Sequence, residues 1–157
     1  MSLRILIVDD HEVVRQGVRT ILAQRPEWEI CGEVANGEEA VQAVSRLRPD
    51  LIILDITMPQ MSGLEAASRI VALSTDVRIL IFTMHESCAL IADIRAAGAH
   101  GYVQKSQAAR DLIFAVDRLL SGGTFFGREL NESSQGNPAP GTPRKPNVSF
   151  CSTFCLA

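Results

Sequence analysis

Residues 51–63 have the sequence LIILDITMPQMSG and carry the strongest local indication of the architecture. The four apolar residues Leu51–Leu54 have the length of a strand buried on both faces, and the acidic Asp55 follows directly. A proline and a glycine come next, and Ser62 and Glu65 have the spacing of a capping box, which predicts a loop and then a helix. This stretch therefore predicts a strand–loop–helix unit with a carboxylate at the carboxyl end of the strand.

The same unit recurs on both sides of this stretch. Four more short apolar runs each precede a stretch whose apolar residues recur at helical spacing. Strict alternation of strands and helices implies a parallel sheet with helices on both faces, and right-handed crossovers favour a doubly wound sheet. The predicted fold is α/β, with three layers built from five strand–helix units. The other predicted strands are Leu3–Val8, Glu29–Ala35, Val77–Phe82 and a short strand with Tyr102 and Val103.

The composition is typical of a folded domain and does not indicate a strongly charged binding partner. Hydrophobic residues make up 46% of the 157 residues, and the net charge is −3, which argues against electrostatic binding to nucleic acids or membranes. No apolar run approaches the roughly 20 residues that cross a bilayer. Because the N-terminus also lacks a secretory pattern, we expect a cytoplasmic location.

Residues 1–127 and 128–157 differ in composition. The second segment is rich in Pro, Ser and Gly, which predicts a linker or a disordered tail. It is too short for a helix-turn-helix domain and lacks a basic stripe, so we expect no sequence-specific DNA binding by this chain alone. Three interpretations of the tail stay open: a natural stand-alone protein, a shortened regulator, or a shifted reading frame.

Polar side chains follow four of the predicted strands at the edge where their carboxyl ends meet. Ligands of doubly wound sheets bind at this edge. Clustered carboxylates repel one another unless a cation joins them, and oxygen ligands favour a hard ion such as Mg²⁺. A lysine and a hydroxyl beside them supply the positioning and charge stabilisation that phosphoryl transfer requires. These residues are Asp9, Asp10, Asp55, Thr83 and Lys105.

Five stretches of the chain form a specific pattern when taken together: ILIVDDHE at 5–12, LDITMPQMSG at 54–63, Thr83, GYVQK at 101–105 and GGTF at 122–125. With these stretches, residues 3–127 resemble the receiver domains of two-component response regulators. The details are most similar to the NarL/FixJ/LuxR branch, whose members usually carry a C-terminal DNA-binding domain. The resemblance implies a flavodoxin-like, CheY-like fold with strand order 2-1-3-4-5, and transcriptional control as the output of a full-length regulator.

The resemblance also implies a role for each residue at this edge. Asp55 is expected to accept a phosphoryl group from a sensor histidine kinase. Asp10, Asp55 and the backbone carbonyl of Thr57 are expected to bind Mg²⁺, with Asp9 acting through water. Such a domain is a switch rather than an enzyme, apart from catalysing its own phosphorylation and dephosphorylation.

A second group of residues is expected to respond to the phosphoryl group. The resemblance implies that Lys105 and Thr83 contact it, and that Thr83 and Tyr102 form a switch. This switch would change the face made by the fourth helix, the fifth strand and the fifth helix. Thr57 and His85 are expected to lie over the phosphoryl group and to tune dephosphorylation.

A phosphatase and a degenerate receiver are alternative interpretations of the same residues. A haloacid-dehalogenase phosphatase needs a second aspartate two residues after its nucleophile, where this chain has Thr57. A degenerate receiver is disfavoured because all five site residues are present. A homodimer through the first and fifth helices, or through the switch face, fits the sequence equally well. His11 and His85 are interpreted as surface or loop residues, and His100 is expected in a solvent-facing loop.

Overall fold

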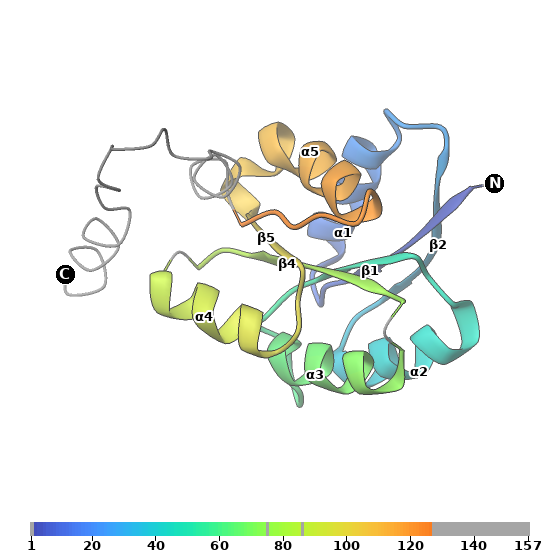
Figure 1. The fold of residues 1–157 in the computed structure, drawn as a ribbon. Coiled ribbons are helices and arrows are strands. Elements are labelled where there is room, and N and C mark those ends of the chain that lie inside the picture. The colour runs from blue at the N-terminus through green and yellow to red at the C-terminus, as the bar shows by residue number, and fades with distance from the viewer. Residues whose placement is uncertain (1, 75, 86, 127–157) are drawn as a thin grey trace, which may run out of the picture.

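The structure, a computed structural model, describes residues 2–74, 76–85 and 87–126 (Figure 1). One sheet forms the middle layer, with α1 and α5 on one face and α2, α3 and α4 on the other. The strands are β1 (Leu3–Val8), β2 (Trp28–Val34), β3 (Leu51–Leu54), β4 (Arg78–Thr83) and β5 (Gly101–Gln104). The helices are α1 (Glu12–Leu22), α2 (Gly37–Leu47), α3 (Gly63–Leu73), α4 (Cys88–Ala96) and α5 (Ala108–Leu120), and the 3₁₀ helix η1 (Lys105–Gln107) precedes α5.

The sheet confirms the predicted fold and strand order. All strand pairs are parallel, in the order β2-β1-β3-β4-β5. The chain therefore changes direction across the sheet between β1 and β3, which is where ligands of such sheets bind. Two strands are shifted by one residue from their predicted bounds, and Thr83 consequently ends β4, where it pairs with Gln104 of β5.

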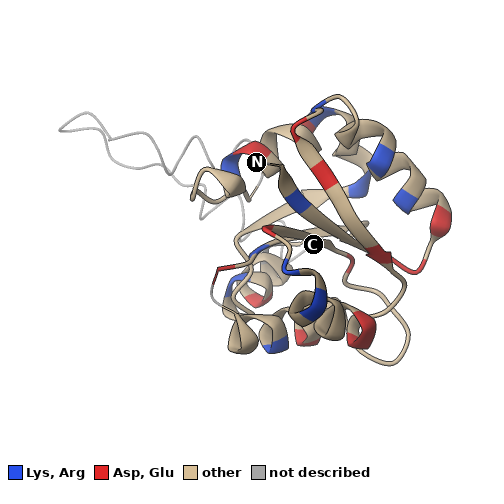
Figure 2. Ribbon diagram, turned by 90° about the vertical axis from the view of Figure 1, so that its right-hand side faces the viewer, with Lys and Arg blue, Asp and Glu red and all other residues tan. Residues whose placement is uncertain are grey.

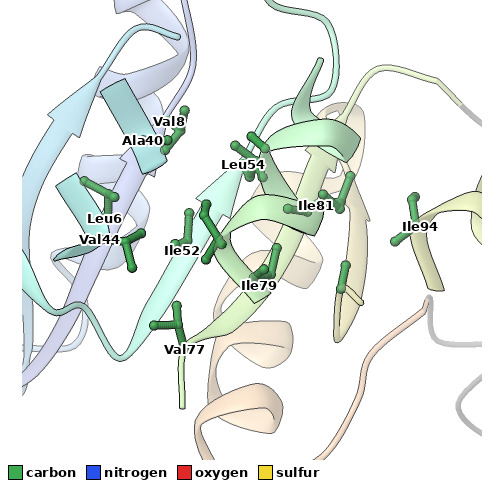
Figure 3. Close-up of a cluster of buried hydrophobic side chains, with 14 of the residues drawn as sticks. Leu6, Val8, Ala40, Val44, Ile52, Leu54, Val77, Ile79, Ile81 and Ile94 are labelled. Carbon is green, nitrogen blue, oxygen red and sulfur yellow. The ribbon is translucent and has the colours of Figure 1, made fainter. Parts of the chain in front are cut away.

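The core consists of two apolar layers, one on each face of the sheet. Successive strand residues point to opposite faces, so Ile5 and Ile7 pack toward α1 and α5, whereas Leu6 and Val8 pack toward α2. Figure 3 shows the second layer, in which side chains from β1, β3 and β4 meet those of α2 and α4. All four residues of β3 are buried, and burying each such side chain contributes about 1.5–3 kcal/mol. The strand that precedes Asp55 is thus held from both faces.

Side-chain caps begin α2 and α3, and the cap of α3 is the one named in the sequence analysis. Asn36 accepts a 2.9 Å hydrogen bond from the Glu39 amide, and Ser62 accepts a 3.2 Å bond from the Glu65 amide. The glutamate side chains of the two caps bind different partners. Glu39 accepts from the amide of Ala35 at 3.2 Å, whereas Glu65 pairs with Arg69 one turn later. The caps nevertheless set where the loops before α2 and α3 end.

The segment after α5 packs along the edge of β5. Phe125 forms a parallel bridge with Gly101, and its carbonyl accepts a 2.7 Å hydrogen bond from the Tyr102 amide. The predicted tail, residues 128–157, lies outside the described residues. Every helix within the described ranges is too short or too polar to span a bilayer.

The prediction for His100 is wrong. Its ring is half-buried, and Nδ1 accepts a 3.1 Å hydrogen bond from the backbone amide of Ile79. Burial, together with the positive charge of Arg78, lowers the pKa of His100. The neutral ring is therefore part of the contact between β4 and the start of β5.

Candidate functional site

The residues predicted to converge do meet at the carboxyl edge of the sheet. Asp9 follows β1 and Asp55 follows β3, and their exposed fractions are only 2% and 3%. Thr83 ends β4 and is fully buried, whereas the Asp10 side chain remains 28% exposed. Two nearly buried carboxylates on neighbouring strands are unfavourable unless positive charge lies beside them.

Lys105 supplies one such charge. Its ammonium, at the start of η1, lies 2.7 Å from Asp9 Oδ2 and 3.4 Å from Asp55 Oδ2. Although Asp9 Oδ2 is buried and close to this ammonium, it accepts no properly oriented hydrogen bond within the described residues. A single lysine is thus the shared partner of two buried carboxylates, and Asp9 Oδ2 is left with incomplete hydrogen bonding.

The environment raises the pKa of Asp55. Burial is the largest cause, and the neighbouring Asp9 charge is the second. Lys105 and the Thr57 backbone amide act in the opposite direction but do not cancel the rise. A further cation at this edge would favour the ionised carboxylate. Ligand atoms of Asp9, Asp10, His11 and Asp55 lie within 4.8 Å of one another, so the residues present fit a metal ion.

The loop between β3 and α3 brings Gly63 close to the Asp55 backbone, which explains why position 63 is a glycine. The Gly63 amide donates a 2.8 Å hydrogen bond to the Ile56 carbonyl, so α3 begins directly against the end of β3. A Cβ atom on Gly63 would lie 2.0 Å from the Asp55 carbonyl oxygen. Within the loop, Gln60 has a φ of +72°, and the Met61 amide donates to the Pro59 carbonyl at 2.9 Å. The close approach holds the Asp55 backbone in place.

His85 connects the residues predicted to lie over the site with those predicted to form a switch. Its Nε2 atom lies 3.3 Å from Thr57 Oγ1, and its amide donates a 3.2 Å hydrogen bond to Thr83 Oγ1. Its carbonyl accepts a 2.7 Å hydrogen bond from the Tyr102 hydroxyl, and the Tyr102 side chain is mostly buried. The contacts of the His85 backbone cannot be predicted from the sequence, because they depend on the conformation of the chain directly after β4.

His11 is the residue whose position the sequence analysis missed. Its side chain is 66% exposed, in agreement with a surface histidine. However, Nδ1 lies 2.9 Å from Asp10 Oδ1 and 3.2 Å from Asp9 Oδ1, so the ring belongs to the acidic cluster. The only sequence signal is its position directly after Asp9 and Asp10.

Comparison with known protein families identifies the family to which this chain belongs. The model of the response regulator receiver domain matches residues 5–117, which include every residue of the site. The chain belongs to the response regulator receiver family. The family therefore agrees with the resemblance stated from the sequence, and the fold is the predicted one.

Individual relatives place this receiver in the predicted branch. It is 37% identical to the transcriptional regulatory protein DegU of Brevibacillus brevis over 125 residues, which are 80% of this chain and 53% of DegU. It is 34% identical to the response regulator UvrY of Escherichia coli over 128 residues, 82% of this chain and 59% of UvrY. The receiver chain therefore spans between half and three-fifths of these relatives.

Two solved structures agree with the family and the fold. A LuxR-family response regulator from Aurantimonas superposes with a TM-score of 0.79 at 35% sequence identity, and the match covers 84% of this chain and 94% of that chain. A CheY-like receiver from Methanospirillum hungatei superposes with a TM-score of 0.71 at 25% identity, covering 78% of this chain and 96% of that chain. The chain is the receiver domain of a NarL/LuxR-type response regulator.

Proposed function

We propose that Asp55 accepts a phosphoryl group from the phosphohistidine of a sensor histidine kinase. The observation that carries the proposal is the position of the Lys105 ammonium, 3.4 Å from Asp55 Oδ2 at the open edge of the sheet. In the transfer, a carboxylate oxygen of Asp55 bonds to phosphorus as the bond from phosphorus to the histidine nitrogen breaks. Lys105 would then pair with a phosphoryl oxygen instead of the free carboxylate.

The acidic cluster supports Mg²⁺ as the accompanying ion. Asp10, Asp55 and the Thr57 carbonyl would hold it directly, and Asp9 through water. When bound, the ion supplies positive charge beside the phosphoryl oxygens. The raised pKa of Asp55 supports this assignment, because burial and the neighbouring Asp9 charge disfavour the ionised carboxylate, and a bound cation would offset both.

The switch would run through His85. Thr83 Oγ1, which now accepts the His85 amide, would donate to a phosphoryl oxygen, and the resulting movement would pass to Tyr102 through the His85 carbonyl. The affected surface is the face of α4, β5 and α5. Thr57 and His85, which contact each other beside Asp55, would tune dephosphorylation by limiting the approach of water.

Incubation with acetyl phosphate and Mg²⁺ tests the central step. Intact-mass spectrometry is expected to find one added phosphoryl group on the wild type and none on Asp55→Asn. Asp76→Asn is the matched control, because Asp76 is an exposed carboxylate before β4, at the opposite edge of the sheet. An unmodified wild type would overturn the proposal. Sustained hydrolysis of small phosphate esters would favour a phosphatase instead.

We propose that the output of this receiver lies in a longer regulator. We assign residues 1–127 to the receiver and 128–157 to a linker or tail without a helix-turn-helix. We also propose a cytoplasmic location and transcriptional control for the full-length protein.

Basic and acidic positions are interspersed along the described helices (Figure 2), so these 157 residues alone should not bind DNA sequence-specifically. A competitor-resistant complex in a gel shift would contradict this. Homodimerisation through α1 and α5, or through the switch face, is compatible with the fold.

A further inference from the structure

The His11 ring lies at the open side of the acidic cluster. Its Nδ1 atom is 2.9 Å from Asp10 Oδ1 and 3.2 Å from Asp9 Oδ1. Two ligands at right angles around an ion, each about 2.1 Å from it, lie about 3.0 Å apart. The spacing between the imidazole nitrogen and both carboxylates therefore matches that of neighbouring ligands around one ion.

Asp10 and Asp55 provide the other side-chain ligands, and Asp9 takes part through water. Oxygen atoms of Asp9, Asp10 and Asp55 lie within 4.8 Å of one another and of the His11 nitrogen, so the four side chains surround one centre. Asp9 Oδ2 is buried 2.7 Å from the Lys105 ammonium and accepts no properly oriented hydrogen bond within the described residues. An all-oxygen set suits both Mg²⁺ and Mn²⁺, whereas an imidazole nitrogen adds affinity for first-row transition metals relative to Mg²⁺.

We infer that His11 Nδ1 is a ligand of the metal held beside Asp55, and that this nitrogen raises the affinity of the site for transition-metal dications such as Mn²⁺ relative to Mg²⁺. The inference rests on the proposed function, because it uses the same metal position. The role of His11 is inferred from its contacts with Asp9 and Asp10, although its side chain is 66% exposed.

The simpler alternative is that His11 only forms hydrogen bonds to the two carboxylates. The two roles predict opposite effects of removing the ring. Loss of a ligand weakens transition-metal binding, whereas loss of a hydrogen-bond donor frees the carboxylate oxygens and strengthens the binding of every cation. His11→Ala should fold normally, because His11 precedes α1 without a side-chain capping bond and its backbone amide keeps its own 2.8 Å bond to Asp9 Oδ1.

Mn²⁺ is the suitable probe. Thiolates favour softer metals, so the four cysteines of the chain compete little for Mn²⁺, whereas they would bind Zn²⁺. Binding of Mn²⁺ and Mg²⁺ to the wild type, His11→Ala and His11→Lys is measured by titration, and pulsed electron paramagnetic resonance of bound Mn²⁺ detects a coordinating ¹⁴N nucleus. His85→Ala is the matched control, because His85 lies beside Thr57 at the same site.

We expect an imidazole ¹⁴N coupling in the wild type and in His85→Ala, and its loss in both His11 variants. Mn²⁺ affinity should fall about tenfold or more in His11→Ala, while Mg²⁺ affinity stays within about threefold. Absence of the coupling in the wild type, its persistence in His11→Ala, or unchanged or tighter Mn²⁺ binding by that variant would overturn the inference.

Phosphorylation by acetyl phosphate with Mg²⁺ separates this inference from the proposed function. A wild type that is phosphorylated but shows no ¹⁴N coupling refutes only the role of His11. A wild type that shows the coupling but never becomes phosphorylated supports the role of His11 and refutes the phosphoacceptor role of Asp55.

Discussion

The phenolic hydroxyl of Tyr102 donates a 2.7 Å hydrogen bond to the backbone carbonyl of His85. Tyr102→Phe removes this bond and keeps the ring, so we expect the free energy of unfolding to fall by about 1 kcal/mol in urea titrations. Hydrogen exchange should also become faster around His85, because the loop loses its tie to β5. Unchanged exchange there would show that the loop does not depend on this bond.

Gly63 and Gly17 form a pair for testing the close approach at Asp55. Gly63→Ala places a Cβ atom against the Asp55 carbonyl, so we expect a loss of about 3 kcal/mol or more, together with loss of phosphorylation by acetyl phosphate. Gly17 lies inside α1, and an added Cβ atom there would meet no atom of another segment within 4 Å, so Gly17→Ala should stabilise the protein by about 0.5–1 kcal/mol. Equal effects of the two variants would contradict this explanation.

Lys105→Gln leaves Asp9 and Asp55 without their shared ammonium. In EDTA we expect a loss of about 3 kcal/mol, because two nearly buried carboxylates lose their partner. Mg²⁺ should raise the melting temperature of this variant more than that of the wild type. Arg69→Gln is the control, since it breaks an ion pair whose side chains are both more than half exposed and should change stability by less than about 0.5 kcal/mol.

His100 should make the protein less stable in mild acid. Its folded pKa is lowered, so the unfolded chain binds more protons, and stability falls as the pH drops below the ordinary value of about 6.5. His100→Asn offers Oδ1 to the Ile79 amide without titrating. Between pH 7.5 and 5.5 we expect the wild type to lose up to about 1 kcal/mol more than the variant in urea titrations. Parallel losses would show that His100 does not titrate differently on folding.

The fold is predictable from the sequence because buried parallel strands are short and almost entirely apolar. Leu51–Leu54 has the length and composition of a buried strand, and the alternation of such strands with helical stretches then restricts the topology of the sheet. The acidic and basic site residues are predictable for the same reason, since parallel strands bring their carboxyl ends to one edge. The strand order itself came from family resemblance, and the structure confirms it.

Other features depend on contacts between distant segments. His100 follows a glycine stop and looks like a loop residue, yet its ring receives the Ile79 amide of the neighbouring strand. Phe125 lies beyond the last helix, yet it pairs with the start of β5. Neither contact leaves a local pattern, because the partners are 21 and 24 residues away along the chain.

Local pattern was therefore enough for the elements, for a parallel sheet and for the acidic and basic residue types near Asp55, whereas the strand order came from family resemblance. Only the tertiary structure decided how these residues act on one another: Lys105 lies between Asp9 and Asp55, burial and Asp9 raise the pKa of Asp55, and His11 joins the acidic cluster. The physical reason is that hydrophobic periodicity is a local property of the chain, whereas charge interactions depend on distance and on exclusion of water. Both are set only when the strand ends meet.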